Sequence, residues 1–179
     1  MNKIISEYEQ VIDKVQKTFG HLSAEQLNWK PRADSWSVGQ CLDHLIKSNE
    51  AFDEQFQALA KGEKKSTFWE KYSPLTNFFG NFLLKSLKND AKKFKAPSKD
   101  IVPPSDISAN IVEVFTKHQT EVVEKLKMLE NADMNSVVTS PFLKLMTYRL
   151  GTALEIGVEH ESRHIRQAER VLQTEGFPK

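Results

Sequence analysis

Apolar side chains recur at the 3.6-residue period of an α-helix along four long stretches of this chain, and this pattern constrains the fold more than any other feature. Each stretch has one apolar side, which must pack against another element to be buried. In the first stretch, which ends before Gly20, the apolar positions are Ile4, Ile5, Tyr8, Val11, Ile12, Val15 and Phe19. We therefore expect an all-α protein.

Signals for helix starts support the same interpretation. Ser23 and Gln26 form a capping-box pattern, in which each side chain satisfies a backbone N–H of the other residue, and it predicts a short helical turn. Ser37 and Gln40 form a second capping box, and apolar residues continue from it at the helical period to about Lys61. The second long helix is thus expected over residues 38–61.

Glycines and prolines interrupt residues 62–104, where we expect only a short helix over Thr76–Lys88. A third long helix is predicted from about Ser105 to Leu129, and a fourth from about Thr147 to Thr174. Four long amphipathic helices in 179 residues predict a single four-helix-bundle domain over residues 1–179, with 62–104 as a long crossover between helices two and three.

Composition excludes several classes of protein. Lysine and arginine number 25 against 24 acidic residues, and a net charge of +1 argues against a general nucleic-acid binder. The single cysteine, Cys41, excludes an internal disulfide and a cysteine-rich zinc cluster. No signal peptide is visible, and no stretch approaches the roughly 18 apolar residues of a membrane span. These features suggest a cytoplasmic protein.

Two of the five histidines carry the clearest chemical signal. His160 and His164 are four residues apart on the fourth helix, so their side chains are separated by about 40° around the axis and about 6 Å along it. Both imidazoles then project from one side and can bind one ion. Gly157, one turn earlier, is expected to leave space for a metal or a substrate.

A catalytic metal usually needs a third protein ligand and an open position. His44 is the natural candidate, because it lies on the inward side of the second helix and facing helices of a bundle commonly build metal sites. The alternative is a hydrogen-bonded core histidine. We interpret His118 as a partly buried structural histidine and His21 as a solvated loop residue.

Residues 160–164 also match the His-Glu-x-x-His pattern of zinc peptidases, in which the glutamate acts as general base. The metzincin extension of that pattern requires glycine and histidine where this chain has Gln167 and Arg170. Only fifteen residues follow His164, and they complete the helix. The peptidase interpretation is therefore disfavoured.

A second interpretation uses more of the chain. Residues 36–45 resemble the W-S-x-x-E/Q-x-x-x-H-L segment of the DinB/YfiT-like superfamily, and residues 160–167 resemble its H-x-x-x-H-x-x-Q segment. Residues 27–31 and 140–142 are also similar to that family. The order and spacing of these segments, and their placement on helices two and four, make the combination more specific than any one of them.

The resemblance implies a four-helix bundle with up-down-down-up connectivity and three histidines that bind a divalent ion such as zinc or nickel. Carried over to this chain, the ligands are His44, His160 and His164. Characterised members include S-transferases and isomerases that use a low-molecular-weight thiol, and many others are described only as metal-dependent hydrolases. Members are often homodimers, although no interface can be identified in this sequence.

A metal held by three neutral imidazoles retains its full charge, and it would activate a bound water for hydrolysis or a small-molecule thiol for S-transfer. Glu161 is either a general base, a residue that orients an imidazole, or a solvated helix carboxylate, and Gln167 is expected to hydrogen-bond within the site. Trp36 is expected to pack at the helix entry, with a place in the wall of the pocket as the alternative. Cys41 is expected to be a small buried side chain, with a position near the metal as the alternative.

Residues 61–99 hold ten lysines against Glu63, Glu70 and Asp90, a net charge of +7, with aromatic residues interleaved. We interpret them as a crossover whose aromatic side chains cap the bundle and whose lysines face water. A lid, or a surface for lipid or nucleic acid that uses Lys92, Lys93 and Lys95, is the alternative. The sequence thus leaves three hypotheses: a metal-dependent transferase or hydrolase, a non-catalytic metal-binding bundle, and a basic binding module.

Overall fold

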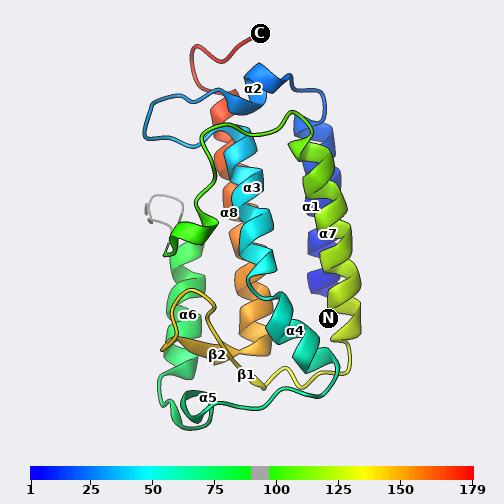
Figure 1. Ribbon diagram of the computed structural model, residues 1–179, viewed down its shortest axis with the longest axis vertical. Coiled ribbons are helices and arrows are strands. Elements are labelled where there is room, and N and C mark those ends of the chain that lie inside the picture. Colours follow the sequence, from blue (N-terminus) through cyan, green and yellow to red (C-terminus); the bar gives the residue numbers. More distant parts are fainter. Residues whose placement is uncertain (90–96) are drawn as a thin grey trace.

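The computed structural model describes residues 1–89 and 97–179, so Lys92, Lys93 and Lys95 lie outside the described residues. Four long helices run along its long axis: α1 (Asn2–Phe19), α3 (Val38–Glu50), α7 (Ile111–Met128) and α8 (Leu150–Leu172). α1 lies beside α7, and α3 lies beside α8 (Figure 1). The all-α class predicted from the sequence is confirmed.

Both predicted capping boxes are present. Ser23 caps α2 (Ala24–Asn28) and Ser37 caps α3, each accepting a hydrogen bond from the backbone N–H of the glutamine three residues later. The amide of Gln40 also donates to the carbonyl oxygen of Pro104, 2.7 Å away. The start of α3 is thereby tied to the end of the crossover.

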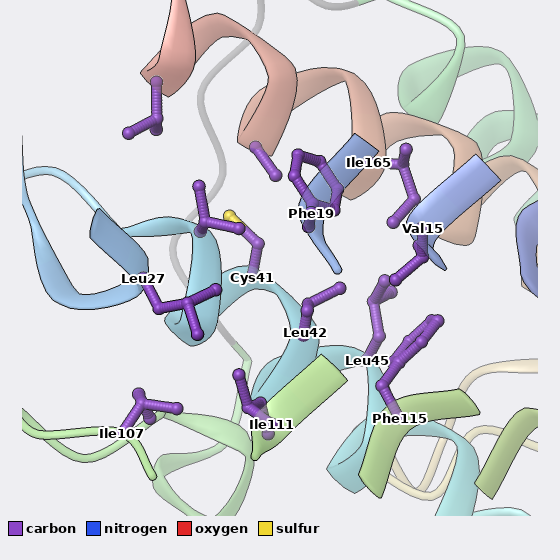
Figure 2. Close-up of a cluster of buried hydrophobic side chains, with 13 residues drawn as sticks. Val15, Phe19, Leu27, Cys41, Leu42, Leu45, Ile107, Ile111, Phe115 and Ile165 are labelled. Atoms are coloured by element: carbon purple, nitrogen blue, oxygen red, sulfur yellow. The ribbon is translucent and has the colours of Figure 1, made fainter. Parts of the chain in front are cut away.

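The main core lies where the four long helices meet. Phe19 and Val15 of α1 meet Leu42 and Leu45 of α3, and all four side chains are fully buried (Figure 2). Cys41 is buried in the same core, as expected. The remaining buried members are Leu27, Val38, Ile107, Ile111, Phe115, Ile165, Ala168 and Val171.

The second predicted helix is not continuous to Lys61. It ends at Glu50, and α4 (Asp53–Ala60) begins three residues later in a new direction, leaning away from α3 (Figure 1). The N–H of Phe52 bonds to the carbonyl of Asn49 rather than one residue further back, which tightens the chain at the break. Asp53 then pairs with Lys125 of α7, so the break directs α4 towards that helix.

The third helix begins at Ile111 rather than near Ser105, and Asn28 supplies the reason. Its side-chain amide donates to the carbonyl of Ile107, and its side-chain oxygen accepts from the N–H of Ile107, both at 2.8 Å. Because both backbone groups of Ile107 are bonded to Asn28, this residue cannot take part in a helical ladder.

The fourth helix begins at Leu150 rather than Thr147, because the preceding residues form a strand. β1 (Val137–Thr139) pairs antiparallel with β2 (Thr147–Arg149), an element that the helical pattern did not predict. The N–H groups of Leu150 and Gly151 donate to the carbonyls of Ser136 and Met134. The chain before β1 thus satisfies N–H groups at the start of α8 that would otherwise have no partner.

The crossover contains more structure than one short helix. α5 (Phe68–Tyr72) begins with a third capping box, and α6 (Thr76–Leu87) matches the predicted helix to within one residue. α6 packs along α8 and β2. Arg163 of α8 donates hydrogen bonds to the carbonyl oxygens of Leu87, the last residue of α6, and of Asn89. A short 3₁₀ turn, η1 (Lys99–Ile101), then leads towards α7.

Candidate metal centre

The structure brings His44, His160 and His164 together at the contact between α3 and α8. One ring nitrogen from each residue lies within 4.8 Å of the other two. The ring centroids of His160 and His164 are 4.6 Å apart, and that of His44 is 5.1 Å and 4.6 Å from them. We call these three residues the histidine cluster. Among the described residues, no other group of histidine, cysteine and acidic side chains converges in this way.

The orientation of His44 is set by the backbone of the crossover. Its Nδ1 lies 2.8 Å from the carbonyl oxygen of Ile101 in η1, and only a protonated Nδ1 can donate to a carbonyl. Nε2 of the neutral ring is then unprotonated, and it faces Nε2 of His160 at 3.2 Å. A backbone partner that fixes the tautomer in this way is typical of metal-binding histidines.

The surroundings keep all three imidazoles neutral. Burial lowers the pKa of His160 to about 3, with the neighbouring His44 and Arg163 acting in the same direction. Burial is also the main cause that lowers the pKa of His44, and it holds the pKa of His164 well below its ordinary value. Neutral imidazole is the form that binds a metal, so no proton needs to be displaced near neutral pH.

These side chains fit a divalent ion. Nδ1 of His164 is buried without a hydrogen-bond partner, as is Nε2 of His118 outside the histidine cluster, so this feature supports a metal only together with the convergence of the three rings. Two nitrogens that bind one tetrahedral zinc at about 2.05 Å are about 3.3 Å apart, close to the 3.2 Å between Nε2 of His44 and Nε2 of His160. Three imidazoles are also a common catalytic zinc ligand set.

Trp36 forms one wall of the histidine cluster. Its ring stacks on His164 at a centroid distance of 5.6 Å and lies 4.7 Å from the ring of His44. It also packs against the main core, as the sequence predicted. Gln167, on the next turn of α8, acts to raise the pKa of His164 against the lowering effect of burial.

Glu161 lies on a different side of α8 from the two histidines and takes part in a separate buried group. Its Oε1 accepts hydrogen bonds from Asn49 of α3 and Gln119 of α7, both at 2.8 Å, and the side chain is 1% exposed. Oε2 is buried without a partner. Burial raises the pKa of Glu161 to about 7, against the lowering effect of the two amide donors. We call Glu161, Asn49 and Gln119 the glutamate cluster.

Gly157 does not leave room for a metal or a substrate, because the hydroxyl of Tyr8 fills the space. A Cβ atom at position 157 would lie 2.6 Å from that oxygen. Tyr8 is 5% exposed, and burial followed by the charge of Glu161 raises the pKa of its hydroxyl. The glycine therefore allows a tyrosine from α1 to approach α8.

The remaining thiol and histidines lie apart from the histidine cluster. Burial raises the pKa of Cys41 to about 12, so its thiol is protonated and enclosed in the core. His118 is buried on α7, with a lowered pKa that also results from burial, and His21 is exposed after α1. The sequence predicted a structural role for His118 and a solvated position for His21, and these positions agree with both predictions.

Sequence reasoning missed four contributors to these two clusters: the carbonyl of Ile101, Tyr8, Asn49 and Gln119. Gln119 had a detectable signal, because it is a polar residue on the apolar side of a helix, between Phe115 and Val122. The carbonyl of Ile101 had none, since any residue could supply it.

Three histidines that converge from two packed helices form an arrangement that could hold a metal ion in a helical protein. The sequence matches the DinB superfamily over residues 7–168, most of its length. This chain therefore belongs to the DinB superfamily. It is also similar to the uncharacterized protein YuaE of Bacillus subtilis (strain 168), with 25% identity over 150 residues that cover 84% of this chain and 85% of YuaE. No solved structure gives a significant match.

Proposed function

We propose that this protein is a divalent-metal-dependent enzyme that transfers a thiol to a small-molecule substrate, with the ion held by His44, His160 and His164. The observation that carries the proposal is the convergence of three neutral imidazoles, one of which has a buried nitrogen without a partner. Membership of the DinB superfamily supports the same assignment. Zinc and nickel are the ions we expect first, because imidazole suits both.

A divalent ion bound to three neutral imidazoles would keep its full charge and lower the pKa of a thiol or a water bound beside it. The Ile101 carbonyl holds His44 in the tautomer that leaves its Nε2 free. Trp36 limits the motion of two of the three rings by packing against them. These residues thus orient the ligands before an ion arrives.

The placement of Glu161 favours S-transfer over hydrolysis. In a His-Glu-x-x-His hydrolase the glutamate must lie beside the attacking water to accept its proton. Glu161 instead directs Oε1 at Asn49 and Gln119. A thiolate is already a competent nucleophile, so S-transfer does not require that base. Hydrolysis with a metal-activated water is the second candidate.

Elemental analysis of the purified protein tests the metal site. We expect close to one zinc or nickel per chain, and loss of that ion in the His160→Ala, His164→Ala double variant. The matched control is the His21→Ala, His118→Ala double variant, which removes the same number of imidazoles outside the histidine cluster. Absence of metal in the wild type, even after loading with zinc, nickel and manganese, would refute the proposal.

An activity screen tests the reaction type. Metal-loaded protein is incubated with glutathione and chlorodinitrobenzene for S-transfer, and with a nitrophenyl ester for hydrolysis. We expect metal-dependent thiol transfer that the His160→Ala, His164→Ala double variant lacks. Metal-dependent ester cleavage without thiol transfer would favour the hydrolase. Bound metal without turnover in a wider range of thiols and electrophiles would favour the non-catalytic metal-binding bundle.

A further inference from the structure

The crossover exposes a row of aromatic side chains that the sequence analysis expected to cap the bundle. That expectation is wrong for the side chains at the outer side of α5 and α6, where Phe68 is 75% exposed and Phe78 is 60% exposed. Six of the eleven large exposed hydrophobic residues of the described chain lie between residues 68 and 82. We call them the α5–α6 face: Phe68, Trp69, Tyr72, Leu75, Phe78 and Phe82.

The fold explains why this face is exposed. The inner side of α6 packs on α8 and β2 through Leu83, Leu84 and Leu87. Gly80 brings α6 close to both, since a Cβ there would lie 2.8 Å from Thr152 and 3.2 Å from Tyr148. With one side of α6 fixed, the opposite side must face outward. Figure 1 shows α6 at the edge of the molecule, with α5 and the strands β1 and β2 near its lower end.

Lysines outnumber acidic residues in the segment that carries the α5–α6 face. Over residues 61–89 there are six lysines and two glutamates, a net charge of +4 in a chain whose total is +1. Glu70 is buried and bonded to Lys64, so its charge is already compensated within the fold. Lys85 is exposed and follows Phe78 and Phe82 at helical spacing, which places it on the same outer side. Lys71 is also exposed, and it lies on α5 between Phe68 and Tyr72 in the sequence.

We propose that the α5–α6 face binds the surface of an anionic phospholipid bilayer, a property separate from the metal site. A helix that presents aromatic side chains flanked by lysines is suited to the boundary between headgroups and acyl chains. There the rings are buried, while the flexible lysine stems extend to the lipid phosphates. No helix over residues 1–89 and 97–179 is both long and apolar enough to cross a bilayer, so the contact is peripheral.

Two other partners fit the face less well. A twofold contact with a second copy would place this face against itself, and its lysines would repel one another. A nucleic-acid platform needs free ring faces on which bases can stack. The rings of Phe78 and Phe82 already lie nearly parallel, at 15° and 6.1 Å, and those of Phe68 and Tyr72 are 5.0 Å apart. The charge and the exposed rings therefore favour a bilayer.

Vesicle co-sedimentation of the full chain tests the proposal. We expect binding to phosphatidylcholine vesicles that contain phosphatidylglycerol, little binding to phosphatidylcholine alone, and weaker binding at high salt. The Phe78→Ser, Phe82→Ser double variant should lower the affinity at least about tenfold. The Lys71→Gln, Lys85→Gln double variant should lower it by about fivefold per lysine. Trp69, the tryptophan of the α5–α6 face, is 44% exposed, and its fluorescence should shift to shorter wavelength on anionic vesicles.

The Val114→Ser, Met128→Ser double variant is the matched control, because both side chains are large, apolar and exposed but lie on α7. It should bind vesicles like the wild type, and circular dichroism checks that every variant is folded. Equal binding to neutral and anionic vesicles would overturn the proposal. So would binding that the aromatic substitutions leave unchanged, or a chain that ignores vesicles but binds oligonucleotides or self-associates through the α5–α6 face. Metal content is independent of all these readouts.

Discussion

The histidine cluster and the glutamate cluster begin at neighbouring residues of α8, yet their polar atoms are satisfied in different ways. In the glutamate cluster, amide groups of Asn49 and Gln119 donate to Oε1 of Glu161, whereas Oε2 of Glu161 is buried without a partner. In the histidine cluster, three neutral rings converge and a nitrogen of His164 has no partner. Burial of polar groups alone therefore does not mark a ligand site. Convergence of three neutral imidazoles marks the candidate site.

Metal removal should have the largest effect and should act only through the histidine cluster. At a free metal concentration about a thousand times its Kd, binding stabilises the fold by about 4 kcal/mol, or roughly 10 °C in Tm. We expect thermal melts of the wild type to show this rise relative to chelator-treated protein. The His160→Ala, His164→Ala variant should show none, whereas Glu161→Gln should retain it. An equal rise in the double variant would place the ion elsewhere.

Glu161→Ala should destabilise the protein by about 3 kcal/mol without changing its metal content. The substitution removes the acceptor of two amide groups and leaves them buried without a partner. Urea unfolding measures the free energy, and elemental analysis measures the metal. Loss of metal at unchanged stability would contradict the separation, because it would assign Glu161 to the histidine cluster.

The pH dependence of stability should reveal Glu161 as well. Its pKa is raised to about 7 in the fold, so the folded state holds the proton more tightly than the unfolded state. It therefore contributes stability below the ordinary carboxyl pKa that is lost as the pH rises through about 7. We compare the free energies of unfolding of the metal-free wild type and the metal-free Glu161→Gln variant. From pH 5 to pH 8 the variant should become more stable relative to wild type by on the order of 2 kcal/mol.

The histidines also make the free energy of unfolding depend on pH, with the opposite sign. Their contribution is the same in wild type and Glu161→Gln, so it cancels in the difference between the two free energies. Their pKa values are lowered in the fold, so their contribution is present above an ordinary histidine pKa and is lost on acidification. A difference that stays constant from pH 5 to pH 8, measured by urea unfolding, would show that Glu161 ionises normally.

Gly157→Ala should have the smallest effect, about 1–2 kcal/mol, because the added Cβ would lie 2.6 Å from the hydroxyl of Tyr8. Since phenylalanine lacks that hydroxyl, the same substitution should cost less in a Tyr8→Phe background. A double-mutant cycle by urea unfolding measures the coupling. Equal costs in both backgrounds would show that Tyr8 is not the obstacle.

Much of the local structure was predictable from the sequence, because helices depend on contacts between near neighbours. The apolar period and the capping residues Ser23 and Ser37 located α1, α2 and the start of α3, and the pair His160 and His164 is local by construction. The errors fell where distant residues override the local pattern. Asn28 holds Ile107 out of the third helix, and strand pairing with β1 removes Thr147 from the fourth.

The sequence by its own pattern determined the all-α class, the helical period and the two histidines that share a side of α8, since each depends on spacing along the chain. The sequence also indicated His44 as the third candidate, but only the tertiary structure decided that its ring meets the other two. The same holds for the carbonyl of Ile101, which fixes the tautomer of His44, and for the bonds of Glu161 to Asn49 and Gln119. These contacts join residues at least 42 positions apart, and they form only when α3, α7 and α8 pack around one core.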